Sequence, residues 1–215
     1  MDPDCLWRSQ STEECQNPEK QTSTELESLA RVLSQETRGH FNILRTRTSK
    51  RDFSGLSQGY FLDILKRTGR LLVNFSGDIY YSGDFKPSKK FVIGDPFLPT
   101  AAYADVHLSS GWMISSGSGR MGADIYFPNG SSKSASEFLQ MTLFAKRGFN
   151  GARLDAWATA LMAGGSDLLE HLWNQTDYQG QWAYFFFDSK GAPKCSPNIR
   201  CQLSTRPYSI DLPWD

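Results

Sequence analysis

Two oxygen-bearing side chains, Asp155 and Thr159, lie four residues apart in the stretch from Gly151 to Gly165. Residues at this spacing stand one above the other on a helix, so the pair would present a carboxylate and a hydroxyl together. Magnesium binds such oxygen ligands and completes its coordination with waters and phosphate oxygens. The spacing is therefore compatible with a metal site for a phosphate-bearing ligand. The structural alternative is that Asp155 only interacts favourably with the helix dipole near the helix start.

The residues around this pair predict a short, mostly buried helix. Its apolar residues recur at the spacing of one helical face: Leu154, Trp157, Ala158, Leu161 and Met162. Gly164 and Gly165 follow, and glycine readily adopts the positive φ that ends a helix. A second helix is expected from Ser166, because serine often caps a helix start. His171 falls in that helix without another metal-binding residue at ligand spacing, and we expect it at the surface or the core edge.

A second stretch that could bind a ligand runs from Asp52 to Asp63 and contains Gly55 and Gly59. These glycines bracket a turn into a predicted helix that ends at Gly69. A helix start presents unpaired backbone N–H groups and the positive end of the dipole, which suits a phosphate group. Glycines at such a place equally allow a helix to pack closely on a sheet. Both interpretations fit the residues.

The remaining pattern predicts mainly strands. Leu71 to Tyr81 is expected to be one strand, interrupted by the polar and glycine residues Asn74, Ser76, Gly77 and Asp78. Such interruptions often mark a bulge or the close approach of a ligand. Further strands are predicted at 91–93, 104–108, 112–115, 123–127, 138–145 and 182–187. Short turns rather than helical crossovers join most of them, so we expect an α+β fold with helices packed on an antiparallel sheet.

The chain has 215 residues, which fits one domain with a core of its own. Residues 1–21 are polar and are expected to form a loosely ordered arm. The domain is expected to span 22–190 and to open with a helix that starts at capping residues near Thr22 and ends at Gly39. Residues 191–215 are rich in proline and are predicted to form an irregular tail.

Composition limits the partners and the compartment. The 23 basic and 23 acidic residues balance, which argues against nucleic acid as a partner. The chain as given has neither a membrane-spanning segment nor a signal-peptide pattern. We therefore expect it in the cytoplasm, or in the periplasm if an upstream signal is missing. Four cysteines lie near the ends without zinc-ligand spacing, and free thiols or two short-loop disulfides fit equally: Cys5, Cys15, Cys195 and Cys201.

Four stretches resemble, in the same order, motifs of the FAD:protein FMN transferases, the ApbE-type family. They are Asp52–Asp63 (DFSGLSQGYFLD), Leu72–Asp78 (LVNFSGD), Ile114–Gly117 (ISSG) and Ala152–Leu161 (ARLDAWATAL). The similarity extends from about residue 22 to residue 165. This resemblance implies a T-fold-like α+β domain that binds FAD, uses Mg²⁺ and transfers FMN onto a Ser or Thr of a client flavoprotein.

The resemblance also implies roles for individual residues. Asp155 and Thr159 would bind the metal together with the carbonyl of Ser57. The residues that would bind FAD are Gly55, Ser57, Gln58, Gly59, Asn74, Gly77, Asp78 and Ser116.

Some positions depart from the family's motifs. Ala123 stands where the family has a histidine, so no residue is assigned to catalysis; loss of a general base typically costs about 10²- to 10⁴-fold in rate. Gln58 and Ser76 replace a lysine and a glycine. The resemblance also leads us to expect that this sequence lacks a counterpart of the family's amino-terminal strand region. Two hypotheses follow: an Mg²⁺-dependent FMN transferase of weakened activity, or a non-catalytic FAD-binding or assembly protein that keeps the fold and the metal pair.

Overall fold

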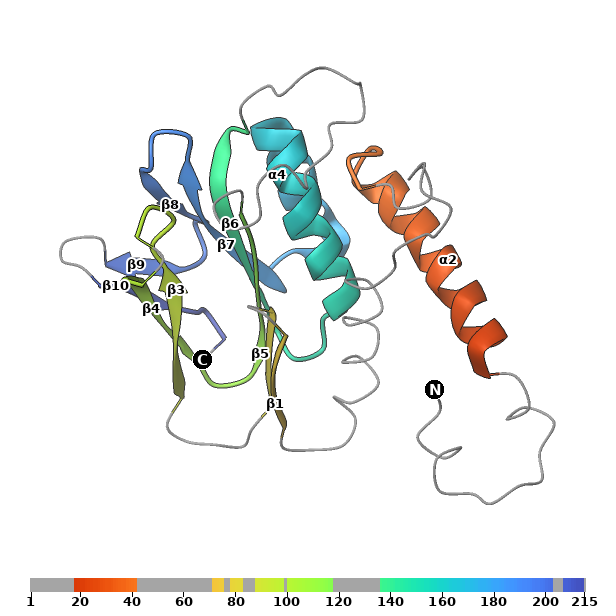
Figure 1. The fold of residues 1–215 in the computed structure, drawn as a ribbon, viewed down its shortest axis with the longest axis horizontal. Coiled ribbons are helices and arrows are strands. Elements are labelled where there is room, and N and C mark those ends of the chain that lie inside the picture. The colour runs from red at the N-terminus through yellow and green to blue at the C-terminus, as the bar shows by residue number, and fades with distance from the viewer. Residues whose placement is uncertain are drawn as a thin grey trace.

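The computed structural model describes residues 18–41, 71–75, 78–82, 88–98, 100–117, 136–202 and 207–214. Within them, the helix α4, a six-stranded sheet and a four-stranded sheet form three successive layers (Figure 1). The helix α2 lies beside α4, on the side away from the sheets. This arrangement confirms the α+β fold with packed helices that the sequence predicts.

The helices are α2 (Pro18–Glu36) and α4 (Gly151–Trp173), and the short 3₁₀ helix η4 (Thr176–Tyr178) follows α4. The larger sheet has the order β1-β2-β5-β6-β7-β8 and consists of antiparallel neighbours: β1 (Leu71–Phe75), β2 (Asp78–Ser82), β5 (Gly111–Gly117), β6 (Phe138–Ala145), β7 (Trp182–Asp188) and β8 (Pro193–Cys195). The smaller sheet has the order β3-β4-β10-β9: β3 (Lys89–Gly94), β4 (Ala102–Leu108), β10 (Tyr208–Asp211) and β9 (Arg200–Gln202). The predicted strands at 91–93, 104–108, 112–115, 138–145 and 182–187 are thus confirmed.

The strand β7 shows how one sheet supports two cores. Trp182 and Phe186 pack into the core beneath α4. Phe185 and Phe187, which alternate with them, pack into the core between the two sheets. Side chains of a strand point to opposite faces in turn. Both faces of β7 are apolar because layers cover the sheet on both sides.

The helix α2 begins at Pro18, so the predicted start near Thr22 is wrong. A proline fits the first turn of a helix, where its missing N–H would have had no partner. The helix ends at Glu36, and Gly39, at φ +80°, lies in the turn that follows. The predicted end is therefore confirmed to within three residues.

The prediction of one interrupted strand from Leu71 to Tyr81 is wrong. β1 and β2 form an antiparallel pair in which Leu71 faces Ser82 and Phe75 faces Asp78. The chain therefore reverses direction between Phe75 and Asp78. Polar residues and glycine between two apolar runs are also the pattern of a tight hairpin. As a result, Asp78 is the first residue of a strand.

The predicted break between two helices is confirmed at Gly165. This glycine has φ +63° and ψ −156° within α4, and the residues on both sides of it are helical. At the start of α4, the Asn150 side chain accepts a 2.7 Å hydrogen bond from the backbone N–H of Arg153. After the break, Glu137 accepts a 2.9 Å bond from the backbone N–H of Ser166. Each half of α4 thus begins at a side-chain cap.

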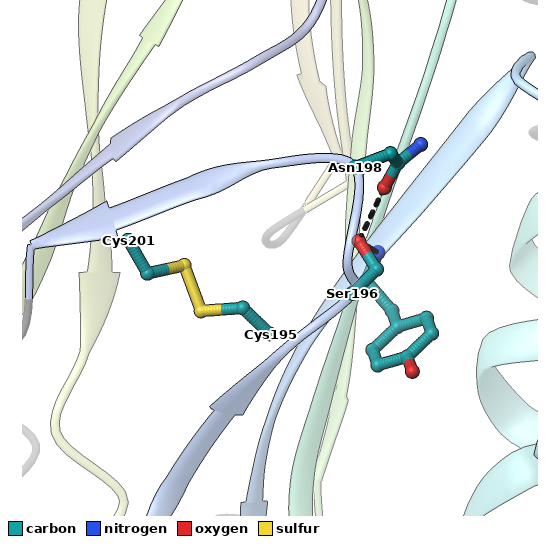
Figure 2. Close-up of a disulfide and its surroundings, with 5 residues drawn as sticks. Cys195, Ser196, Asn198 and Cys201 are labelled. Carbon is teal, nitrogen blue, oxygen red and sulfur yellow. Dashed lines mark hydrogen bonds between the residues drawn. A yellow bond between two sulfur atoms is a disulfide. The ribbon is translucent and has the colours of Figure 1, made fainter.

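The irregular tail predicted for residues 191–215 contains three short strands, β8, β9 and β10. A disulfide between Cys195 and Cys201 joins β8 to β9 (Figure 2). Between these cysteines, Ser196 Oγ donates a 2.7 Å hydrogen bond to Asn198 Oδ1, and Asn198 Nδ2 donates to the carbonyl of Trp182 on β7. The proline signal misled the prediction because an edge strand tolerates proline at its first residue, as at Pro193 of β8.

Several predictions concern residues outside the described ranges. They are the helix from 55–59 to Gly69, the strand at 123–127, residues 1–17 of the arm predicted over 1–21, and the state of Cys5 and Cys15; residues 18–21 of that arm belong to α2 instead. Among the helices that the structure describes, none combines the length and apolar character needed to cross a membrane.

Candidate functional site

Two carboxylates, Asp78 and Asp155, come together between the six-stranded sheet and α4. Asp78 lies two residues before Tyr80, which is buried in the core beneath α4. Because strand side chains alternate, Asp78 faces α4 as well. Asp155 lies on α4, which packs on β5 and β6, and β5 is the neighbour of β2 in the sheet. The two carboxylates are near enough for their charges to repel.

Burial raises the pKa of both groups, and the charge of Asp155 adds to the rise at Asp78. The pKa of Asp78 is raised to about 7, mainly by burial and then by the charge of Asp155; a hydrogen bond from the backbone N–H of Ser115 opposes the rise. Burial raises the pKa of Asp155 to about 6. Both residues nevertheless keep part of their surface accessible to solvent. Two ionised carboxylates so placed destabilise each other, and a cation between them would remove the repulsion.

Hydroxyl groups lie beside the carboxylates. Thr159 follows Asp155 by one helical turn, and its Oγ1 is 3.5 Å from Ser116 Oγ on β5. Ser116 follows Ile114 by two residues, and Ile114 is buried in the core beneath α4. The same face of the sheet therefore presents Asp78 and Ser116 to the stripe of α4 that carries Asp155 and Thr159.

A favourable interaction with the helix dipole does not explain the position of Asp155. The first turn of α4 contains no acidic residue, and Asp155 is in the second turn. A favourable interaction with the dipole would lower the pKa of a carboxyl group. The pKa of Asp155 is instead raised by burial. The environment of Asp155 thus disfavours its charge.

Sequence reasoning missed Ser115 and Thr142. Ser115 reaches Asp78 through its backbone N–H, and its Oγ is 2.9 Å from Thr142 Oγ1 on the neighbouring strand β6. The available signal was the pair of adjacent serines in a strand, because only one of them can face the helix. Ser116 is that residue, while Ser115 holds the strand and Asp78 together.

Gly151 sets how closely α4 approaches the sheet. A Cβ atom at this position would lie 2.3 to 2.7 Å from three atoms of the Trp112 ring, which is fully buried. The ring is fixed by a 3.0 Å hydrogen bond from Trp112 Nε1 to the carbonyl of Phe149. A glycine is therefore required for the helix to start against this ring, four residues before Asp155.

Other residues predicted at the site lie elsewhere or outside the described ranges. Asn74 is paired with Ile79 on β2, so it points to the face of the sheet opposite to Asp78, and it is exposed. The Nδ1 atom of His171 accepts a 2.9 Å hydrogen bond from the Arg38 guanidinium. Both residues line a polar depression beside the second half of α4. The predicted contacts outside the described residues are Gly55, Ser57, Gln58, Gly59 and Gly77.

The donor groups suit a hard cation. In the part of the chain that the structure describes, no three His, Cys, Asp or Glu side chains gather as a metal-binding group. A metal ion at this interface would bind carboxylates together with neutral oxygens such as the Thr159 hydroxyl. Oxygen-only donors with few carboxylates are typical of Mg²⁺ sites that also use waters and phosphate oxygens.

Solved structures that align with this chain include flavin transferases. The ApbE protein from Thermotoga maritima aligns with a TM-score of 0.62 at 17% identity, over 83% of this chain and 76% of that chain. The flavinyl transferase ApbE from Pseudomonas stutzeri aligns with a TM-score of 0.61 at 16% identity, over 82% and 73%. The flavin transferase ApbE from Vibrio cholerae aligns with a TM-score of 0.60 at 12% identity, over 80% and 73%. No protein-family model matches the sequence, and no curated protein does.

The chain therefore has the α+β fold of the ApbE flavin transferases. At 12 to 17% identity this likeness concerns the fold, and it confirms the resemblance that the four sequence motifs indicate. Two of these motifs, Ile114–Gly117 and Ala152–Leu161, face each other through Ser116 and Thr159.

Proposed function

We propose that this protein is an Mg²⁺-dependent flavin transferase that binds FAD and moves FMN from it onto a Ser or Thr hydroxyl of a client flavoprotein. The observation that carries the proposal is the convergence of two mutually repelling carboxylates, Asp78 and Asp155, with the Thr159 and Ser116 hydroxyls. This cluster lies in a chain with the fold of ApbE flavin transferases. Motifs that resemble those of the family contribute all four residues.

In this proposal Asp155 and Thr159 hold the metal, with the carbonyl of Ser57 as a third protein ligand. Mg²⁺ bound there would supply positive charge beside the pyrophosphate oxygens of FAD. Asp78 and Ser116 lie on the sheet side of the same interface and are proposed FAD contacts. The other proposed contacts are Gly55, Gln58, Gly59 and Gly77, whereas Asn74, on the opposite face of the sheet, is not retained as one.

The proposed reaction is a phosphoryl-type displacement. The oxygen of the client hydroxyl forms a bond to the FMN-side phosphorus, and the bond from that phosphorus to the bridging oxygen breaks. AMP leaves with the bridging oxygen and its electron pair, and the hydroxyl loses its proton. The protein's contribution to such a reaction is mostly positioning and charge stabilisation. The rigid pairing of β2 with β5, and of β5 with α4, is suited to that task.

The second candidate is a protein that binds FAD without turnover. The sequence favours it at Ala123, which stands where the family has a histidine, and at Gln58, which stands where the family has a lysine. The fold and the carboxylate cluster would be the same in both cases. The two candidates differ in whether AMP appears when the protein is incubated with FAD, Mg²⁺ and a peptide or protein that offers hydroxyl groups.

Two measurements test these proposals. FAD is titrated by fluorescence against wild type, Asp155→Asn and Thr159→Val, each with Mg²⁺ and with chelator. We expect Mg²⁺ to tighten FAD binding by wild type, to have no effect on Asp155→Asn and to have a reduced effect on Thr159→Val, because an amide oxygen or a methyl group is a poor partner for a hard dication. If the affinity of wild type for FAD does not change with Mg²⁺, the metal site is refuted. AMP release then separates transferase from binding protein.

The compartment is also a proposal. A disulfide such as Cys195–Cys201 persists in oxidising compartments and is rare in the reducing cytosol of mesophiles. We therefore favour the periplasm, the second of the two compartments that the sequence allows. Mass spectrometry of the unreduced peptide that contains both cysteines, from protein isolated in its native compartment, tests this. Two free thiols there would favour the cytoplasm.

A further inference from the structure

A single carboxylate on α2, that of Glu36, contacts two side chains of α4 and one of η4. Glu36 Oε2 accepts hydrogen bonds from Arg153 Nε at 3.0 Å and from Trp157 Nε1 at 3.2 Å, and Glu36 Oε1 accepts from the Tyr178 hydroxyl at 3.3 Å. The Arg153 guanidinium also lies 4.9 Å from the centre of the Tyr178 ring. The side chains of Glu36 and Arg153 are only 16% and 19% exposed, so solvent competes weakly for these bonds.

These contacts are on the opposite side of α4 from the proposed metal pair. An α-helix turns by about 100° per residue. Arg153 and Trp157 therefore form one stripe, and Asp155 and Thr159 form another that is displaced by about 200° around the axis. Because the helix is rigid over this one turn, any rotation at the Glu36 side appears with equal angle at the Asp155 side.

The other contacts between α2 and this half of α4 are less directional. On the α2 side, Ala152 and Ala156 pack against Ala30 and Leu33. Burial of such small apolar groups is favourable but non-directional. Hydrogen bonds from two residues of α4 to one carboxylate oxygen depend on angle as well as distance. Glu36 is thus the directional contact on this side.

Small rotations matter for the proposed metal. A rotation of about 20° would move an oxygen that lies about 5 Å from the helix axis by roughly 2 Å. Mg²⁺ requires nearly ideal octahedral geometry with oxygens at about 2.1 Å. Such a movement would separate the Asp155 and Thr159 oxygens from a shared ion.

We propose that Glu36 is a positioning residue: its hydrogen bonds to Arg153 and Trp157 fix the rotation of α4 so that Asp155 and Thr159 can bind one cation. This inference rests on the proposed function, because the site that Glu36 positions is the proposed Mg²⁺ site. Glu36 does not contact that ion, so its effect must pass through the helix.

The test compares Glu36→Ala with Leu33→Ala, which weakens the same α2–α4 interface but leaves the hydrogen bonds in place. Binding of Mg²⁺ alone is measured by calorimetry, and stability by urea unfolding. Both variants should lose stability. Only Glu36→Ala should weaken Mg²⁺ binding, by about tenfold, the lower end of what outer partners of metal ligands typically contribute. Glu36→Gln keeps the shape and one acceptor, and should restore part of the affinity.

Hydrogen exchange gives a readout that needs no metal. Backbone amides of residues 153–159 should exchange faster in Glu36→Ala than in Leu33→Ala when the two are compared at equal global stability. Wild-type Mg²⁺ affinity in a folded Glu36→Ala protein would overturn the inference and leave the proposed function intact. If wild type does not bind Mg²⁺ and so behaves like Asp155→Asn, both the proposed metal site and this inference are refuted.

Discussion

Replacing Asp155 by asparagine removes one of two carboxylates that repel each other. In the metal-free protein the pKa of Asp155 is raised from 3.8 to about 6 and that of Asp78 from 3.8 to about 7. One pKa unit corresponds to about 1.4 kcal/mol, so ionised Asp155 destabilises the fold by at most about 3 kcal/mol. The asparagine amide still loses water on burial, which offsets part of the gain. We expect metal-free Asp155→Asn to be about 1 to 2 kcal/mol more stable than wild type at pH 8.

The same shifts determine how stability depends on pH. A carboxyl group with a raised pKa holds more protons in the folded than in the unfolded state. For Asp155 and Asp78 this holds between pH 3.8 and about 6 or 7, so the free energy of unfolding decreases as the pH rises through that window. The decrease should be smaller in Asp155→Asn, because one group is gone and Asp78 loses its repelling neighbour. Urea unfolding at pH 5 and pH 8, in chelator and in Mg²⁺, measures these differences.

Adding Mg²⁺ should reverse the order of stability between wild type and Asp155→Asn or reduce the difference. An ion that binds only the folded state stabilises it, so Mg²⁺ should raise the stability of wild type at pH 8 and leave Asp155→Asn unchanged. Asp167→Asn, an exposed charge change on the same helix, is the control and should lower stability by no more than about 0.5 kcal/mol. If metal-free Asp155→Asn is less stable than wild type at pH 8, Asp155 has a favourable partner in the fold and the electrostatic argument is refuted.

Three further changes test the elements around the site. Gly151→Ala should lower stability by about 1 to 3 kcal/mol and weaken Mg²⁺ binding, because a methyl group there meets the buried Trp112 ring; equal unfolding curves would contradict the close approach. Glu137→Gln should lower the free energy of unfolding by about 0.5 kcal/mol, allowing for solvent screening. Because the hydrogen bond from Ser166 lowers the pKa of Glu137, this difference from wild type should be present above pH 4.5 and should vanish in acid-unfolding curves as the pH falls. Reduction of the Cys195–Cys201 disulfide should lower the unfolding free energy by about 2 kcal/mol, as the short loop predicts, and an unchanged Tm in reductant would refute this.

The placement of Asp155 and Thr159 together could be predicted because helical periodicity is a local property. Five apolar residues at helical spacing determine which face of α4 is buried, and the pair lies at the edge of that face. The break at Gly165 was predictable for the same reason, since a glycine with positive φ is a local signal. Neither prediction needed information on what packs against the helix.

The position of Asp78 could not be derived in this way. A polar segment within an apolar run is compatible with a bulged strand and with a hairpin. Only the pairing of β1 with β2 distinguishes a hairpin from a bulged strand. That pairing also decides on which face of the sheet the Asp78 side chain lies. The strands β8, β9 and β10 were missed for a related reason. They have three or four residues each, too few for a period to be recognised, and β10 pairs in parallel with β4, a strand about a hundred residues earlier in the chain.

Glu36 shows most clearly what sequence patterns leave out. It lies 117 residues before Arg153, and its place at the end of α2 suits an ordinary exposed glutamate. Its role follows only from the packing of α2 on α4, which brings Arg153 and Trp157 to one carboxylate. The oxygens of Asp155 and Thr159 are local in sequence, yet their direction depends on this distant contact. For that reason, Glu36→Ala in the outer helix should change the affinity for the proposed metal, which Glu36 does not contact.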